Sequence, residues 1–359
     1  MNGYVKKQAN LKYEDNTNNL RQEMHSDIGR IVRGDYVFTK GKEFIIAIIF
    51  GVILPTIMFS SLFPTKAANG SEEVASVTLP HVNTETELLI PVLVKEETVV
   101  YMDLEDYIIG VLLQEMPAEF ESEALKAQAV ASRTYTLRRY EKRFKHGNAA
   151  VCTDSSCCQA YCSPESYLRN GGSEECIEKV TNAVTETSGQ VLTYAGELIE
   201  ATYFSCSGGM TEDARAVWGA DIPYLQATPS PGEESADHYS DTVTLSLNEF
   251  ERTLGFDLTG HPEKWIQDIT YTQGGGVETV NICNRTYTGV ELRKLLNLRS
   301  TAFVITVVGD TVSITTKGFG HRVGLSQYGA DAMAVSGYGY EQILAHYYSG
   351  SVLTTYMGK

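Results

Sequence analysis

One acidic residue, Glu115, lies where a helical pattern predicts an inward-facing carboxylate. Leu104, Ile108, Val111 and Glu115 fall on one stripe of a helix, and Pro117 follows just beyond it. A carboxyl group that is desolvated and close to the negative end of a helix dipole should have a raised pKa. Such a group can protonate a glycosidic oxygen at neutral pH. The same spacing also fits a carboxylate that ends the helix at the surface.

A short run of the chain concentrates potential metal ligands. His146, Cys152, Cys157 and Cys158 supply four soft ligands within 13 residues, the composition of a closed tetrahedral zinc site. The alternative is disulfide bonding, the usual state of cysteines outside the cytoplasm. The odd total of seven cysteines and the adjacency of Cys157 and Cys158 weaken this alternative. We expect a structural zinc ion, with Cys162 as a competing ligand and the bonding of other cysteines left open: Cys176, Cys206 and Cys283.

An arginine in the following helical segment has two interpretations. Arg133 shares a stripe with Val130 and Leu137, so it should point toward the interior or into a cleft. Its guanidinium could hold a sugar carboxyl or lactyl group through forked hydrogen bonds. It could equally pair with an acidic side chain inside the fold, and spacing does not decide between them.

Two glycine-rich segments contain polar residues for which the sequence does not indicate a catalytic role. Ser205 and Ser207 precede a glycine pair, but the pattern of a nucleophilic serine elbow is absent, so we expect them to line a loop or a substrate. His321 lies in a glycine-rich stretch, which is typical of a structural hydrogen-bonding histidine. That stretch is no phosphate-binding loop, because no Lys-Ser/Thr pair follows it.

The elements that would position these residues follow from hydrophobic periodicity and turn residues. They indicate a mixed α+β fold in which a helical catalytic segment is followed by hairpins, a second lobe and two closing helices. The core with its metal-binding segment should cover 87–225 and resume at 301–359, with the second lobe or insertion at 226–300. The expected elements are strands 88–94 and 98–102, helices 104–116 and 122–140, a hairpin of 190–194 with 199–205, and a hairpin of 302–308 with 311–316.

An uncharged segment near the start of the chain predicts a membrane anchor. Residues 44–63 are 20 residues without a charge, enough to cross a bilayer core as a helix. Residues 1–43 carry a net charge of +2 while the whole chain carries −16, so the acidity lies beyond the segment. The positive-inside rule predicts a cytoplasmic tail at 1–43, a stalk at 64–86 and an extracytoplasmic body in the cell membrane. A cleaved signal peptide is disfavoured by the long polar leader, and the acidic body argues against nucleic acid as a partner.

Four segments, taken together, resemble the stage II sporulation protein D family. The first is LEDYIIGVLLQEMPAEFESEALKAQAVASRTY at 104–135, which contains the candidate acid. The second is the cysteine-rich stretch from His146 to Tyr161, where the family usually has His in place of Cys157. The others are YFSCSGG at 203–209, with VWG and PYL after it, and GFGHRVGLSQYG at 318–329.

The resemblance implies a lytic transglycosylase that cleaves between N-acetylmuramic acid and N-acetylglucosamine in peptidoglycan. Glu115 would be its single acid and base, and the muramic acid 6-hydroxyl would attack its own anomeric carbon to leave a 1,6-anhydro end. This fits a sequence without an obvious carboxylate pair. Substrate contacts would fall on Arg133 and Tyr203. The implied substrate is peptide-stripped glycan, the setting is engulfment during sporulation, and the partners are stage II sporulation proteins P, an amidase, and M.

Two other functions are compatible with the same residues. A zinc-dependent amidase or peptidase would need an open metal position and a water-activating carboxylate. A non-catalytic glycan-binding subunit that enhances a partner amidase would bind stripped glycan without releasing an anhydro product. Loss of activity with retention of metal after replacement of Glu115 would favour the glycan-cleaving enzyme.

Overall fold

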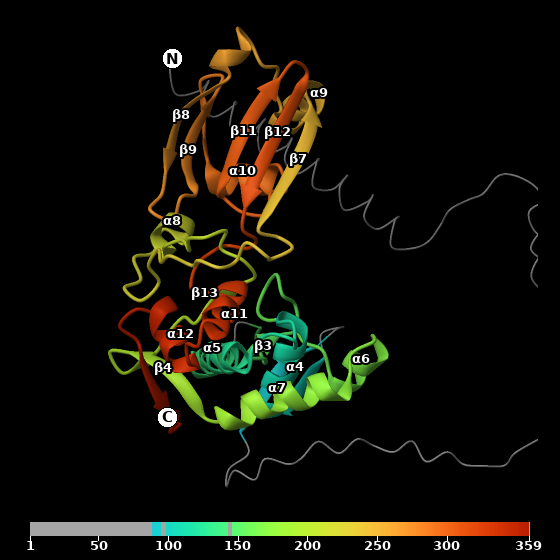
Figure 1. Ribbon diagram of the computed structural model, residues 1–359, viewed down its shortest axis with the longest axis vertical. Coiled ribbons are helices and arrows are strands. Elements are labelled where there is room, and N and C mark those ends of the chain that lie inside the picture. The colour runs from blue at the N-terminus through green and yellow to red at the C-terminus, as the bar shows by residue number, and fades with distance from the viewer. Residues whose placement is uncertain (1–87, 95–97, 143–145, 359) are drawn as a thin grey trace, which may run out of the picture. The chain divides into compact units, whose positions relative to one another are not determined.

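The computed structural model describes residues 88–94, 98–142 and 146–358. The predicted tail, membrane span at 44–63 and stalk lie outside these residues. Within the described part of the chain, no helix is both long and apolar enough to cross a membrane. The described chain combines helices with several small sheets, which confirms the mixed α/β character of the body (Figure 1).

Helix α4 (Leu104–Glu115) ends one residue before the predicted boundary at 116, and it carries the candidate acid near its C-terminus, as predicted. It begins at Asp103, whose side chain accepts hydrogen bonds from the N–H groups of Glu105 and Asp106 at 2.9 and 3.2 Å. The chain leaves the helix at Met116 in an extended conformation, because the residue before a proline avoids helical geometry. The capping residue and Pro117 therefore fix both ends of the helix, and with them the position of Glu115.

Helix α5 (Ser122–Glu141) is the element on which most of the other helices of this region pack. Its small side chains let α4 and α7 (Glu174–Glu186) approach closely. Four alanines of this helix have no exposed surface: Ala124, Ala127, Ala129 and Ala131. The remaining helices here are α6 (Pro164–Arg169), α8 (Ala214–Trp218), α11 (Gln327–Val335) and α12 (Tyr340–Tyr347), of which the last two are the predicted closing helices.

Small sheets connect these helices. The predicted first pair of strands is confirmed, since β1 (Leu89–Leu93) runs antiparallel to β2 (Val99–Asp103) and parallel to β3 (Val151–Cys152). In another sheet β4 (Gln190–Tyr194) lies between β5 (Glu197–Leu198) and β14 (Val352–Thr355).

The predicted hairpin of 190–194 with 199–205 is only partly correct. Its second strand, β5, ends at Leu198, and the chain then forms β6 (Tyr203–Phe204), which runs parallel to β13 (Leu325–Ser326). Gly324 permits this pairing, since its φ is +86° and a Cβ there would lie 2.1 Å from the carbonyl oxygen of Thr202. The β6–β13 pair places residues 203–209, here called the serine–glycine segment, beside residues 318–329, here called the glycine-rich stretch.

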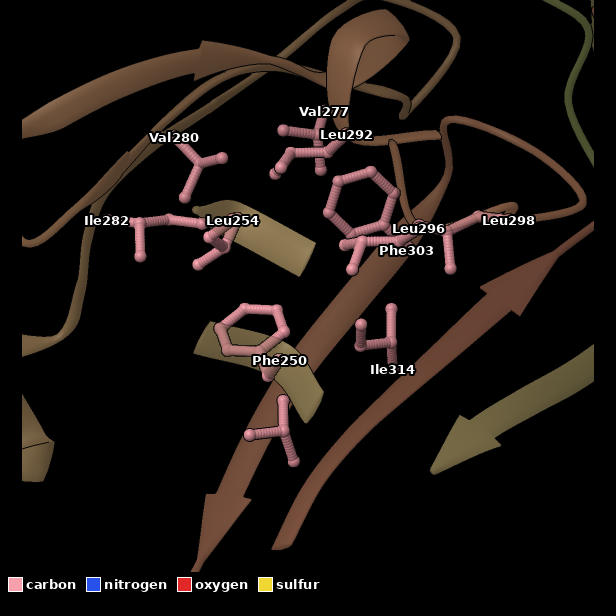
Figure 2. Packing of buried hydrophobic residues seen from close by; sticks show 11 residues of the cluster. Phe250, Leu254, Val277, Val280, Ile282, Leu292, Leu296, Leu298, Phe303 and Ile314 are labelled. Carbon is pink, nitrogen blue, oxygen red and sulfur yellow. The ribbon is translucent and has the colours of Figure 1, made fainter. Parts of the chain in front are cut away.

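A second lobe has its own hydrophobic core (Figure 2). Phe250, Ile282, Leu292 and Ile314 have no exposed surface and come from separate elements of this lobe. One three-stranded sheet has the order β11-β12-β7 and the other the order β10-β9-β8. The elements are β7 (Ser240–Ser246), α9 (Leu247–Leu254), the 3-10 turn Pro262–Lys264, β8 (Ile266–Tyr271), β9 (Val277–Ile282), β10 (Arg285–Thr288), α10 (Gly289–Leu295), β11 (Phe303–Val308) and β12 (Thr311–Lys317).

The second lobe extends past the predicted boundary at residue 300. The β11–β12 hairpin forms as predicted, but β12 also pairs along its length with β7, from Thr311 with Ser246 to Lys317 with Ser240. Phe303 and Ile314 belong to the core of the lobe. The hairpin is therefore part of the second lobe and not of the C-terminal part of the core, because its apolar face is buried there.

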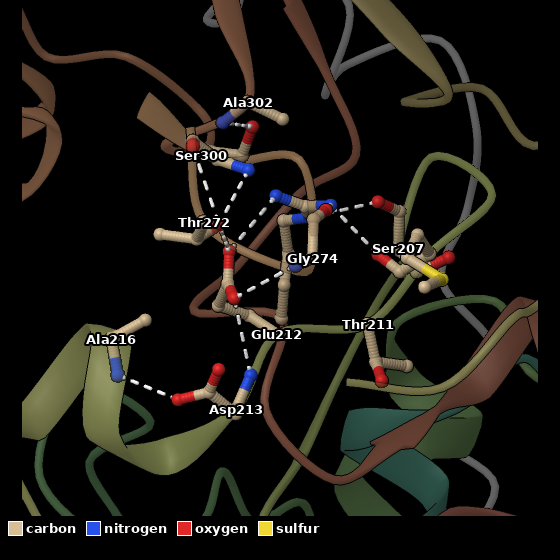
Figure 3. Close-up of polar contacts among 12 residues, drawn as sticks. Ser207, Thr211, Glu212, Asp213, Ala216, Thr272, Gly274, Ser300 and Ala302 are labelled. Atoms are coloured by element: carbon tan, nitrogen blue, oxygen red, sulfur yellow. Dashed lines mark hydrogen bonds and ion pairs between the residues drawn. The ribbon is translucent and has the colours of Figure 1, made fainter. Parts of the chain in front are cut away.

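Two buried charged residues join the second lobe to the serine–glycine and glycine-rich segments. Glu212 accepts hydrogen bonds from the Thr272 hydroxyl at 2.6 Å and the Gly274 N–H at 3.3 Å (Figure 3). Arg322 donates to the carbonyl oxygens of Gly274 and Ser207 at 2.7 and 2.8 Å. These bonds tie the base of the lobe to the segments that line the candidate site.

Candidate active site

Glu115 lies on the wall of a cleft with a volume of about 660 Å³. Its side chain is half-buried, and one carboxylate oxygen accepts a hydrogen bond from the backbone N–H of Ala160 at 2.5 Å. Burial raises the pKa of Glu115, and the hydrogen bond from Ala160 offsets only part of that rise. The structure thus supports the inward-facing interpretation of this carboxyl over the surface one.

Tyr203 lies in the same cleft and is held by Gln159. The Gln159 amide donates to the Tyr203 hydroxyl at 2.9 Å, and its carbonyl accepts from the Thr136 hydroxyl at 2.8 Å. Burial raises the pKa of Tyr203, and the negative charge of Glu115 raises it further. The phenol is therefore protonated at neutral pH, and because its oxygen already accepts from Gln159, its proton is directed elsewhere.

The four predicted metal ligands form one cluster. The ligand atoms of His146, Cys152, Cys157 and Cys158 all lie within 4.8 Å of one another. The His146 Nε2 is 3.3 Å from the Cys158 sulfur and 3.7 Å from the Cys157 sulfur. Sulfurs on a tetrahedral zinc ion lie about 3.8 Å apart, so the cluster fits such an ion.

The other cysteines do not take part in this cluster. All seven cysteines of the chain are among the described residues, and none of them forms a disulfide. The Cys162 sulfur lies 3.5 Å from the carbonyl oxygen of Ser163, and Cys157 and not Cys162 belongs to the cluster. Four protein ligands would fill a tetrahedral ion and would leave no open position on it.

A buried tyrosine lies near the cluster, close enough to feel the charges of Cys158 and Cys152. Tyr107 has no exposed surface, and within the described part of the chain its hydroxyl has no hydrogen-bond partner. Burial raises the pKa of Tyr107, and the charges of Cys158 and then other acidic neighbours raise it further. An unpaired buried donor is costly, and a metal-bound thiolate would be an acceptor to which such a hydroxyl donates a hydrogen bond.

The metal cluster and the candidate acid are joined by consecutive residues, here called the 157–160 segment. Cys157 and Cys158 belong to the cluster, Gln159 holds Tyr203, and Ala160 holds Glu115. An ion in the cluster would fix the start of this segment. The metal would then hold the two cleft residues in place without taking part in chemistry.

A second carboxylate, Glu200, also lines the cleft. It accepts hydrogen bonds at 3.0 Å from both Arg138 and Arg139, and Arg139 also bonds its other oxygen. Burial acts to raise the pKa of Glu200, but the two guanidinium groups outweigh it and hold the pKa below its usual value. The cleft therefore pairs a carboxyl of raised pKa with a carboxylate that stays ionised.

Arg133 is not placed to contact a substrate, which corrects the role implied by the resemblance. Its side chain has no exposed surface and forms a forked pair with Glu105, at 2.9 Å from Nε and 2.5 Å from Nη2. Its guanidinium also donates to the carbonyl oxygens of Val184 and Gln190 at 3.2 Å. Arg133 therefore pairs with an acidic side chain inside the fold, which is the second of its two interpretations. Its guanidinium nitrogens all donate to groups inside the fold.

The two serines of the serine–glycine segment have different surroundings. Ser205 lines the cleft together with Tyr203. Ser207 has no exposed surface and donates to the buried carboxylate of Glu233 at 2.8 Å, so its predicted substrate contact is wrong. Glu233 also accepts from the Ser326 hydroxyl at 2.7 Å, and it therefore ties the serine–glycine segment to the glycine-rich stretch.

His321 has the structural role that the sequence predicts. Its Nδ1 accepts a hydrogen bond from the Val323 N–H at 3.1 Å. Burial, assisted by the positive charge of Arg293, lowers the pKa of His321 to about 4, so the ring is neutral at physiological pH. A neutral ring whose Nδ1 accepts a backbone bond fixes the loop and has no proton to donate from that nitrogen.

Some residues of the cleft that bear on its chemistry have no role in the sequence-based prediction. Gln159 and Trp218 lie inside the segments that carry the family resemblance, so their position in those motifs was the available signal. Arg139 and Glu200 come from different segments and meet only in the fold. No local pattern identifies such a pair.

Loss of a cluster cysteine is expected to abolish metal binding. The full-length chain should bind one transition-metal ion, and an excess of 100-fold over the dissociation constant should stabilise it by about 2.7 kcal/mol. Cys158→Ala should lose both the ion and this stabilisation, as measured by elemental analysis and thermal unfolding. Cys176→Ala, which lies outside the cluster, should keep them. Retention of metal by the Cys158 variant would contradict the assignment.

Comparison with known proteins agrees with this arrangement of motifs. A family model described as "Stage II sporulation protein" matches residues 94–194. The chain is 40% identical to stage II sporulation protein D of Bacillus amyloliquefaciens over 77% of this chain and 83% of the relative. It is 36% identical to stage II sporulation protein D of Bacillus subtilis (strain 168), over 84% of this chain and 92% of the relative. An amidase enhancer of the same strain is 31% identical over 69% of this chain and 40% of that protein. The chain therefore belongs to the stage II sporulation protein D family.

Proposed function

We propose that this protein is a lytic transglycosylase that cleaves the glycan strands of peptidoglycan between N-acetylmuramic acid and N-acetylglucosamine. One observation carries the proposal: a half-buried carboxyl group, Glu115, lines a cleft and has a raised pKa. A carboxyl that remains protonated near neutral pH can donate a proton to a glycosidic oxygen. The cleft residue Tyr203 adds a protonated hydroxyl beside it, suited to hold the sugar.

The reaction would require only Glu115 for proton transfer. Glu115 donates its proton to the oxygen that leaves with N-acetylglucosamine, and the bond from that oxygen to the muramic acid C1 breaks. The muramic acid 6-hydroxyl then bonds to C1 and gives its proton to the Glu115 carboxylate. The product is a 1,6-anhydro end, no water is consumed, and Glu115 returns to its protonated form.

The state of Glu200 favours this reaction over hydrolysis. Among the described residues that line the cleft, Glu115 and Glu200 are the carboxylates. A hydrolase would use the second carboxylate as a base or nucleophile. Both oxygens of Glu200 accept hydrogen bonds from arginines, and its pKa is lowered, so it is a weak base. Its charge suits a different task, the stabilisation of positive charge that develops on the sugar.

We further propose that the cluster holds a structural zinc ion, that residues 44–63 anchor the chain in the cell membrane, and that the described body lies outside the cytoplasm. The substrate would be glycan stripped of its peptides by an amidase. Stage II sporulation proteins P and M would be its partners during engulfment. Four protein ligands leave no open zinc position, which argues against a zinc amidase or peptidase.

A second candidate function is a glycan-binding subunit that enhances a cell-wall amidase. The similarity to an amidase enhancer over 69% of this chain favours it. Such a subunit would bind stripped glycan through the same cleft and would not need proton transfer from Glu115.

Analysis of the products distinguishes these functions. Peptide-free glycan strands incubated with the full-length protein should yield fragments with 1,6-anhydro ends, which mass spectrometry separates from ordinary reducing ends by the mass of one water. Reducing ends would show a hydrolase instead. Binding without any release would favour the non-catalytic subunit.

A further inference from the structure

An exposed tryptophan lies on the cleft wall. Trp218 ends helix α8, lines the same cleft as Glu115, and keeps 44% of its surface exposed. The chain has one other tryptophan, Trp265, which lies in the second lobe and is only 6% exposed. Ligand-binding clefts are lined predominantly by hydrophobic and aromatic side chains, so an exposed indole on a cleft wall is a candidate contact for a ligand.

The indole ring of Trp218 is held in place by its neighbours. The His321 ring lies 5.3 Å from it at 57°, and His321 in turn packs against Phe204 at 5.7 Å and accepts the Val323 N–H. Helix α8 is fixed at its start by Asp213, whose carboxylate accepts the Ala216 N–H at 2.7 Å. One part of the indole is therefore supported by fixed groups while the rest faces the cleft.

We propose that Trp218 is the stacking platform for a pyranose ring of a bound glycan strand. The axial C–H groups of an N-acetylhexosamine give the ring an apolar face, and a fixed aromatic ring binds such a face at little cost in side-chain entropy. The cleft supplies polar groups for the sugar hydroxyls from Ser205 and Tyr203. This inference rests on the proposed function only in its choice of glycan as the ligand.

The platform would serve binding and not proton transfer. A stacking contact holds the sugar equally before and during bond cleavage, so its loss should raise KM and leave kcat nearly unchanged. We expect Trp218→Ala to weaken glycan binding about tenfold, which corresponds to loss of one aromatic contact. Trp218→Phe should keep most of the affinity because it retains a ring.

Indole fluorescence tests the platform directly, because only two tryptophans exist. The probe is peptide-free glycan of alternating N-acetylglucosamine and N-acetylmuramic acid. It is titrated into the full-length Glu115→Gln variant with Trp265→Phe, so that Trp218 is the sole indole and turnover is slow compared with the titration. We expect a saturable change of emission and protection from acrylamide quenching. Tyr101→Ala, which removes a 67% exposed aromatic outside the cleft lining, should leave affinity unchanged.

The outcomes separate this inference from the proposed function. If wild type releases anhydro ends while Trp218 emission stays constant and Trp218→Ala keeps KM, the platform is wrong and the lyase stands. If glycan binds with the expected emission change but no product forms, the platform stands and the lyase is wrong. If no glycan binds and no product forms, both are overturned.

Discussion

Glu115→Gln is expected to slow the release of 1,6-anhydro ends by about 10²–10⁴-fold, the usual contribution of a general acid and base. The amide has the same shape and can still accept the Ala160 hydrogen bond, but it cannot exchange a proton with the substrate. Affinity for stripped glycan should change little. The measurement is a time course of product by mass spectrometry, with binding measured on the same preparation.

The same variant should be at least as stable as the wild type. Burial raises the pKa of Glu115 from its ordinary value of 4.5, so between that value and the raised one the folded state binds more protons than the unfolded state. Stability from this group is therefore fully present at low pH and is lost as pH rises through the folded-state pKa. The advantage of Glu115→Gln over wild type should grow from pH 4 to pH 8 in thermal unfolding.

Two results would contradict this account of Glu115. One is turnover that survives the substitution, which would move the proton transfer to another residue. The other is a loss of stability that does not depend on pH, which would show that the carboxylate is needed as a structural anion. Wild-type activity should also fall as pH rises and Glu115 ionises, and that fall should be absent from any residual activity of the variant.

Arg133→Met is expected to lower the free energy of unfolding by about 3–5 kcal/mol, because it leaves the Glu105 carboxylate buried and without its cation. Arg133 is fully buried and holds both oxygens of Glu105. A substrate contact would give a different result, with normal stability and a raised KM. Chemical denaturation and kinetics at low temperature distinguish the two.

A paired variant provides the control. Glu105→Gln together with Arg133→Met removes the negative charge of Glu105 along with the arginine. In the wild type the Gly189 N–H donates to Glu105 at 3.1 Å, and the amide oxygen of the glutamine can still accept that bond. The double variant should recover more than half of the lost stability, because the main penalty is the unpaired charge. Equal instability of the double and single variants would mean that Arg133 acts mainly through Val184 and Gln190.

The spacing of residues within short segments of the sequence predicted the helices and the cysteine-rich segment that contain the candidate site residues. The stripe that ends in Glu115 and the stripe through Arg133 locate helices α4 and α5, since each signal lies within a few turns of chain. The spacing of His146 and the three cysteines predicted the cluster for the same reason.

The failures involve partners that are distant along the chain. Periodicity shows that Arg133 points inward, but not that Glu105 meets it. The β11–β12 hairpin is visible locally, yet its assignment to the second lobe depends on β7, which the sequence pattern does not connect to it. Glu200 likewise meets its partners, two arginines on α5, only in the folded chain.

The way in which the second lobe is inserted has an evolutionary consequence. The chain enters the lobe at Ser240 and leaves it at Lys317, and these two residues face each other across paired strands. Their Cα atoms are therefore separated by roughly 5 Å, a gap that a tight turn can close. A lobe whose first and last residues lie side by side can be enlarged, shortened or replaced during evolution. Strands β6 and β13, which precede and follow it in the sequence, need not move. The contacts between the lobe and the glycine-rich stretch would then need replacement, among them the bonds of Glu212 and Arg322 and the bond from the Gly320 N–H to the Arg299 carbonyl oxygen.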